Sequence, residues 1–208
     1  MARKRFGIAV LATVTILVAS AFAQRSNEVA GSIGRSIISD EGVSGIVSGN
    51  PNVHFGQAWT YEGNFSHRFL NFGIASISVE IPIVYDPKTK VQFGPSNSVP
   101  KDFSAYFLTP AARVNLFPTT ALSPWVSIGA GFARFNPNTT LEFGGGSAAV
   151  SQTNAVFQVG GGLDVGPWDH FKIRGEIRDF NSSEPPINLN KGNRYSHIYA
   201  GLGLVFKF

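Results

Sequence analysis

The sequence YSHIYAGLGLVFKF, from Tyr195 to Phe208, decides the fold because its residues alternate between two unlike sets. One set is wholly apolar and consists of Ile198, Ala200, Leu202, Leu204, Phe206 and Phe208. The other set consists of His197, Tyr199, Gly201, Gly203, Val205 and Lys207. Successive side chains of a β-strand point to opposite sides, so a period of two residues indicates a strand with two different faces. The stretch therefore predicts a strand with one apolar face that ends on an aromatic residue.

The beginning of the chain predicts export. Residues 3–5 are basic, residues 7–18 form an apolar run, and Ala21-Phe22-Ala23 is a small-residue cleavage motif. This order is typical of a secretory signal peptide. A membrane-anchoring helix is the alternative, but it needs roughly 20 apolar residues and this run is shorter. We expect residues 1–23 to be the signal peptide and residues 24–208 to form one domain.

The composition of the expected mature chain argues against several classes of protein. Three of the 17 basic residues lie in the signal peptide, which leaves 14 basic against 13 acidic residues. This near-neutral balance removes the main support for a nucleic-acid partner. The chain has no cysteine, so it has no disulfide framework. Its 14% charged residues, 23 glycines and 18 phenylalanines fit a membrane barrel, with a soluble sandwich as the alternative.

Alternation divides the mature chain into eight predicted strands. Each is close to the roughly 9–11 residues that a tilted strand needs to cross a bilayer. Pro110 cannot donate to a β-ladder, so we expect a bulge there. The expected strands are residues 27–36, 55–66, 72–84, 104–117, 124–135, 153–165, 170–180 and 195–208.

The connections between these strands alternate in length. Short turns are expected at residues 67–71, 118–123 and 166–169, whereas the connections after the first, third, fifth and seventh strands are long and polar. Short periplasmic turns and long extracellular loops are typical of outer-membrane barrels. The even number of strands then places both ends of the domain in the periplasm.

The aromatic residues are expected to form two belts at the membrane interfaces. The alternative is that they are core residues of a soluble sandwich. One belt, near the short turns, consists of Trp125, Trp168, Phe171, Phe206 and Phe208. The other, near the long connections, consists of Phe55, Tyr106, Phe135, Phe180 and Tyr195.

On these features, the mature chain resembles the superfamily of small eight-stranded outer-membrane barrels, which includes the transmembrane domain of outer membrane protein A, outer membrane protein X and the opacity proteins. The resemblance implies an all-β, eight-stranded, antiparallel up-and-down transmembrane β-barrel in the cell outer membrane, with lipid and lipopolysaccharide around it. It also implies insertion by the barrel-assembly machinery, with the strand ending in Phe208 as the assembly signal. The expected role is non-enzymatic, in envelope integrity or surface contact. A lipid A-modifying enzyme and a soluble, lipocalin-like periplasmic carrier are the alternatives.

Ten charged side chains are expected to point into the barrel, five of each sign. An eight-stranded barrel has room inside for little more than side chains, and buried charges need partners. We therefore expect an ion-paired plug, with a narrow ion path as the alternative. Inward Gly160, Gly162, Gly201 and Gly203 are expected to make room for long basic side chains. The ten residues are Arg113, Lys172, Arg174, Arg178, Lys207, Glu28, Glu62, Glu80, Asp164 and Glu176.

The sequence predicts no catalytic, cofactor-binding or metal site. The four histidines, His54, His67, His170 and His197, show no metal-ligand spacing. Ser196-His197 departs from the His-x-Ser pattern of the lipid A deacylases, because Ile198 and Tyr199 follow the histidine. The Gly144–Gly146 run lacks a lysine and a following helix, so it is expected to be a loop and not a phosphate cradle.

Two arginines are expected on the lipid-facing surface. Alternation places Arg35 and Arg134 on this face, each at the end of its strand near a long connection. At that level a charge costs only about 0–1 kcal/mol, and guanidinium groups match the phosphates of lipopolysaccharide. The alternative is that both side chains extend into solvent.

Overall fold

The computed structural model describes residues 26–38, 41–42, 52–55, 58–92, 102–137, 151–168, 170–182 and 195–208. The predicted signal peptide lies outside these residues. The strands are β1 (Asn27–Ile38), β2 (Glu41–Gly42), β3 (Asn52–Phe55), β4 (Ala58–Asn71), β5 (Ala75–Gln92), β6 (Asp102–Leu108), β7 (Ala111–Leu116), β8 (Leu122–Pro137), β9 (Gln152–Val165), β10 (Phe171–Ser182) and β11 (Tyr195–Lys207). Within the described ranges, no helix is long and apolar enough to cross a membrane.

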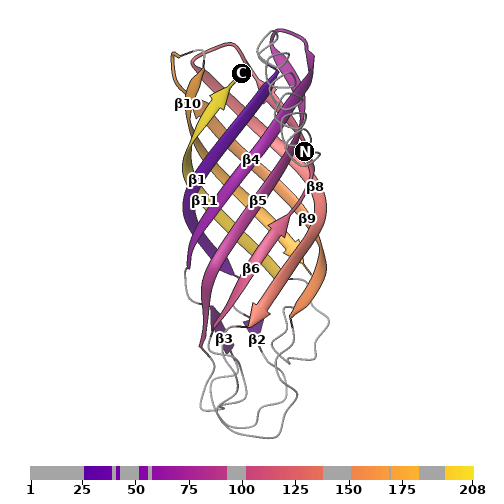
Figure 1. Cartoon of the computed structure of the whole chain (residues 1–208), viewed down its shortest axis with the longest axis vertical. Coiled ribbons are helices and arrows are strands. Elements are labelled where there is room, and N and C mark those ends of the chain that lie inside the picture. The colour runs from indigo at the N-terminus through magenta and orange to yellow at the C-terminus, as the bar shows by residue number, and fades with distance from the viewer. Residues whose placement is uncertain are drawn as a thin grey trace, which may run out of the picture.

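The strands close into an antiparallel barrel (Figure 1). β4 pairs with β5, β8 with β9, β9 with β10 and β10 with β11, and β1 pairs with both β4 and β11. β6 and β7 together form one barrel strand, because both pair with β5 on one side and with β8 on the other. β2 and β3 are short additions beside the far end of β5. The barrel proper therefore has eight strands, which confirms the predicted fold class.

The closing seam joins the first and last strands of the domain. The β1–β11 ladder runs from Glu28 opposite Lys207 to Ile38 opposite His197. Beyond its end, the amide of Asn27 donates to the carbonyl of Phe208 at 3.0 Å, and the amide of Phe208 donates back at 2.9 Å. The carboxyl terminus lies at the rim that carries the short turns, opposite the end that carries β2 and β3 (Figure 1).

The bulge predicted at Pro110 is wrong: the ladder is interrupted there, but the register on both sides continues without an extra residue. The strand stops at Leu108 and resumes at Ala111, and Thr109 and Pro110 lie outside the ladder. Two backbone hydrogen bonds bridge the gap: the Thr109 amide donates to the Pro82 carbonyl at 3.4 Å, and the Ala130 amide donates to the Pro110 carbonyl at 3.2 Å. The break therefore leaves the barrel wall joined on both sides.

The predicted turn at residues 67–71 is wrong. β4 continues through Asn71, with His67 and Arg68 opposite Val79 and Ser78 of β5, and the register shifts between Arg68 and Leu70. The chain reverses instead at residues 72–74, where Gly73 has a φ of 82°. Glycine adopts this left-handed conformation without the steric cost that other residues carry. β4 is therefore longer than its alternating sequence pattern predicts, because its pairing with β5 continues to Asn71.

The polarity of the barrel is the reverse of that of a water-soluble protein. Its outer surface presents apolar side chains such as Val126, Leu202 and Leu204, which are 63%, 67% and 64% exposed. Its interior holds charged side chains such as Arg174 and Glu80, both 0% exposed. Lipid hydrocarbon around the barrel suits the apolar outer surface, and polar groups inside the barrel suit the charged inner surface. This arrangement confirms the predicted alternation of β11 and excludes an aqueous location for this outer wall.

The predicted aromatic belts are correct only in part. Trp168, Phe171 and Tyr106 are exposed as expected, and Phe206 and Phe208 stack on each other near the short turns. Trp125, Phe135, Phe180 and Tyr195 are instead buried. In β8 and β10 the reason is alternation, since Trp125 and Phe135 share the inward face of Ser127, and Phe180 shares that of Arg178. Phe55 falls among the residues whose side chains are not described.

Candidate functional site

The interior of the barrel is the candidate functional site, and its charged half lies toward the short turns. All ten predicted charges point into the lumen, and none is more than 7% exposed. They come from seven of the eight barrel strands, the exception being β8. The predicted set of inward charges is therefore confirmed.

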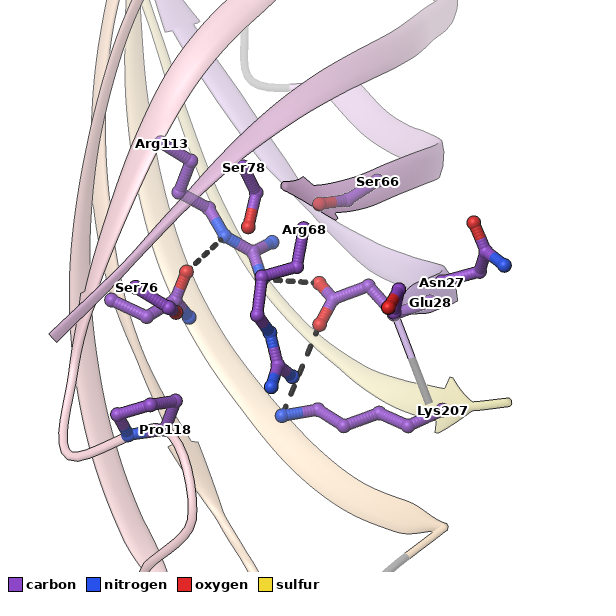
Figure 2. Close-up of a pocket in the computed structure, with 11 residues that line it drawn as sticks. Asn27, Glu28, Ser66, Arg68, Ser76, Ser78, Arg113, Pro118 and Lys207 are labelled. Carbon is purple, nitrogen blue, oxygen red and sulfur yellow. Dashed lines mark hydrogen bonds and ion pairs between the residues drawn. The ribbon is translucent and has the colours of Figure 1, made fainter. Parts of the chain in front are cut away.

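Glu28 of β1 is the first centre of the ion-pair network. It pairs with Arg113, with Arg174 at 2.8 Å and with Lys207 at 3.9 Å. Figure 2 shows its carboxylate between Arg113 of β7 and Lys207 of β11. Arg174 also binds Asp164 through two bonds, from Nε at 2.7 Å and from Nη2 at 2.9 Å. Strands that are far apart in the sequence are thus linked across the lumen.

Arg178 of β10 is the second centre. Its guanidinium pairs with Glu62 at 3.0 Å, Glu80 at 2.7 Å and Glu176 at 3.2 Å. Glu80 also pairs with Arg113 at 3.4 Å, which joins this centre to the one around Glu28. The network is therefore continuous across the charged half of the lumen.

Trp125 of β8 forms an apolar platform inside this network. The guanidinium carbons of Arg113, Arg174 and Arg178 lie 5.3, 5.1 and 5.0 Å from its ring centroid, within cation–π range. Its Nε1 donates to Asp164 Oδ1 at 3.3 Å. An indole can face three cations and still donate to a carboxylate, which explains why this tryptophan lies inside and not in the interfacial belt.

The inward glycines have a different use from the predicted one. A Cβ at Gly162 would lie 2.6 Å from the Trp125 ring, and one at Gly201 would meet the Tyr199 ring. At Gly203 it would meet the backbone of β1 at the Gly31 carbonyl oxygen. Only Gly160 faces a basic side chain, with Arg178 Cγ at 3.2 Å. The glycines therefore mainly make room for aromatic rings and for a neighbouring strand.

An aromatic cluster fills the other half of the lumen, toward the long connections. Phe107 is central to it, with ring centroids at 4.8 Å from Phe180, 5.9 Å from Phe135 and 5.4 Å from His197. Phe103 contacts Phe135 at 5.9 Å. Smaller buried apolar residues complete the cluster: Ile38, Val84, Ala105, Ala133 and Val156. Sequence reasoning missed this cluster, although the alternation of β8 and β10 indicated it.

Ser196 and His197 do not form a catalytic pair. His197 is 3% exposed and lies inside the aromatic cluster. Ser196 is next to it in β11 and so points to the opposite face, where its Oγ donates to Asp179 at 2.5 Å. Among the described residues, no group of three or more His, Cys, Asp or Glu side chains could hold a metal ion. The side chain of His54 and the Gly144–Gly146 run lie outside the described residues.

Arg35 and Arg134 are both exposed on the outer surface near the long connections. The guanidinium carbon of Arg35 lies 4.5 Å from the ring centroid of Trp59. Arg134 Nε donates to Asn136 Oδ1 at 3.2 Å. Both side chains therefore lie on the face where a lipid or a lipopolysaccharide phosphate could reach them.

Arg68 is a further inward cation that sequence reasoning missed, because residues 67–71 were expected to form a turn. In the structure Arg68 extends the inward face of β4 beyond Glu62, Asn64 and Ser66. Its side chain enters the lumen mouth near Glu28 and Lys207 (Figure 2). Arg68 follows Glu62 by an even number of residues, so continued alternation along β4 would have predicted that its side chain also points inward.

The fold, the apolar outer wall and the charged lumen together define a small eight-stranded transmembrane β-barrel. No known family model matches the chain, and no curated protein is similar to it by sequence.

Solved structures nevertheless share the fold over most of the chain. Neisserial surface protein A is 16% identical with a TM-score of 0.54, over 88% of this chain and 97% of that protein. Outer membrane protein OprG from Pseudomonas aeruginosa is 12% identical with a TM-score of 0.55, over 88% and 96%. Outer membrane protein AlkL, solved in DMPC bilayers, is 15% identical with a TM-score of 0.51, over 88% and 90%. The expected outer-membrane location agrees with these neighbours.

Proposed function

We propose that this chain is a non-enzymatic barrel with a sealed lumen, which contributes to envelope integrity or surface contact through its long extracellular connections. The observation that carries the proposal is the filling of the lumen by two blocks in series. The ion-pair network closes the periplasmic half, and the aromatic cluster closes the extracellular half. An ion would have to break several charge-assisted bonds and then cross an apolar segment, so the geometry favours a plug over a narrow ion path.

The two alternative functions are less well supported by the same geometry. A lipid A-modifying enzyme needs a nucleophile and a base within hydrogen-bond reach of each other, whereas Ser196 and His197 lie on opposite faces of β11. A lipocalin-like carrier needs a free apolar cavity and a polar outer wall. The outer wall here is apolar, and the lumen is occupied by side chains.

The test is conductance in planar lipid bilayers, made with protein refolded to a heat-modifiable barrel. We expect no steady conductance above that of the protein-free bilayer. Mass spectrometry of lipid A from cells that express the protein should show an unchanged acyl pattern. Steady single-channel steps would contradict the sealed lumen, and a shortened acyl pattern would contradict the non-enzymatic reading.

Contact with lipopolysaccharide is the second part of this proposal and rests on Arg35 and Arg134. We expect the double variant Arg35→Gln, Arg134→Gln to co-purify with about tenfold less lipopolysaccharide, since each guanidinium loses charge-assisted bonds to phosphate. The amount is measured by phosphate and fatty-acid analysis of the purified protein.

The matched control is Lys88→Gln, which also removes one exposed positive charge, here paired with Asp102 at 3.2 Å. It should retain the wild-type amount of lipopolysaccharide, and all variants should keep their heat-modifiable mobility. Equal co-purification by the arginine variant and the wild type would show that these two side chains only extend into solvent.

A further inference from the structure

A basic cavity lies at the short-turn mouth of the lumen. Its volume is about 320 Å³, and its walls are the turns at residues 118–121 and 166–168 together with Arg68, Lys172 and Lys207. The described residues that line it include no aspartate or glutamate. We call this cavity the basic vestibule. A narrower pocket continues inward from it past Arg68 and Lys207 to Glu28 and Arg113 (Figure 2).

The three cations of the basic vestibule are only weakly neutralised by the protein. Lys172 Nζ donates to the Thr120 carbonyl at 2.6 Å, which orients the ammonium without cancelling its charge. Lys207 is 3.9 Å from Glu28, the longest of that carboxylate's three ion pairs. Within the described part of the chain, the Arg68 guanidinium has neither a hydrogen bond nor an ion pair.

Glu28 offsets only part of this positive charge, because one carboxylate is shared among several cations. Its two oxygens already pair with Arg113, Arg174 and Lys207. Asp164 is likewise shared, because it also binds Arg174 and Trp125. Among the described residues, the rim of the lumen therefore carries an excess of positive charge, and the low-dielectric barrel wall concentrates its electric field at the opening.

We propose that the basic vestibule binds a phosphate-bearing anion from the periplasmic side. A guanidinium and two ammonium groups around one cavity can each donate to the oxygens of a multiply charged phosphate. Trp168, 61% exposed at the edge of the cavity, offers an apolar surface for the rest of such a molecule. The phosphate can come from a soluble phosphate compound or from a phospholipid headgroup of the inner leaflet, and the recognition chemistry is the same.

The test is a titration of the refolded barrel in octyl glucoside, a detergent without phosphate, followed by tryptophan fluorescence and calorimetry. Inorganic phosphate is added at constant ionic strength, with sodium chloride as the reference anion. We expect saturable binding of phosphate by the wild type. In the variant Arg68→Gln, Lys172→Gln we expect the affinity to fall about tenfold or more, because glutamine keeps a donor at each site but removes the charge.

The control variant is Lys88→Gln, which loses one exposed positive charge at the opposite end of the barrel. It should bind phosphate as the wild type does, and heat-modifiable mobility shows that every variant is folded. A parallel titration with monomeric dihexanoylphosphatidylglycerol separates the two sources: tighter binding than phosphate indicates a headgroup, and weaker binding indicates a soluble ligand. Unsaturable binding in the wild type, or equal affinity in the Arg68 and Lys172 variant, would overturn the proposal.

Discussion

Arg174→Ala should lower the free energy of unfolding by about 3–5 kcal/mol, the range for removal of one partner from a buried ion pair. The guanidinium is 0% exposed and makes two bonds to Asp164 and one to Glu28. Glu28 keeps Arg113 and Lys207 after the substitution, whereas Asp164 keeps only the Trp125 Nε1 donor among the described contacts. The loss is measured as a shift of the urea midpoint in lipid vesicles.

Two further variants show whether unpaired charge is the cause. Ile173→Val, at the adjacent position on the outer face, should leave the urea midpoint almost unchanged. Arg174→Ala combined with Asp164→Ala should recover part of the lost stability, because the double variant no longer buries an uncompensated carboxylate. If Arg174→Ala is as stable as the wild type and conducts ions in planar bilayers, the network is the gate of a channel and not a plug.

Deletion of Phe208 should lower the yield of folded protein in the outer membrane several-fold. The deletion removes the ring that stacks on Phe206 and the backbone group that accepts from Asn27 at 3.0 Å. It also removes the aromatic end of the strand that we propose as the signal for the barrel-assembly machinery. The yield is measured as the heat-modifiable fraction in outer-membrane preparations.

The control for this deletion is Phe157→Ala, which removes an apolar ring that is 44% exposed on the outer wall of β9. Phe135→Ala is unsuitable, because Phe135 is 0% exposed inside the aromatic cluster and its truncation costs stability by itself. Equal yields from the deletion and from Phe157→Ala would assign the effect of Phe208 to general apolar surface and not to recognition of the last strand.

The period of two carried most of what the sequence could predict. It identified the barrel strands and the inward direction of the charges, because both depend only on local alternation. The missing ladder donor of Pro110 marked the site of the interruption, although not as the predicted bulge. The alternation rule, applied consistently, would have placed Phe135 with Ser127 and Phe180 with Arg178 inside the barrel. An aromatic residue near a strand end is typical of an interfacial belt, but at both positions the alternation of the strand decides the direction of the ring.

Contacts across the lumen could not be predicted in this way. Arg174 and Glu28 are 146 positions apart, and nothing local to either residue selects that pairing from the five cations and five carboxylates available. Trp125 lies among three arginines only because the barrel closes. For the same reason, the need for a glycine at position 162, where a side chain would clash with the Trp125 ring, could not be predicted. Arg68 was missed because strand ends are set by pairing with a neighbour, here β5, and not by the residues of the strand alone.

The seam between Asn27 and Phe208 has a consequence for biogenesis. The contacts that close the barrel join residues at the two extremes of the domain, so their loop-closure entropy is the largest of any strand pairing in this chain. Until the last strand is in place, β1 and β11 both present unpaired backbone groups, the condition under which β-proteins pair with the wrong neighbour. The unfinished barrel is therefore a sheet with two unpaired edges, and both edges need shielding until β1 and β11 meet.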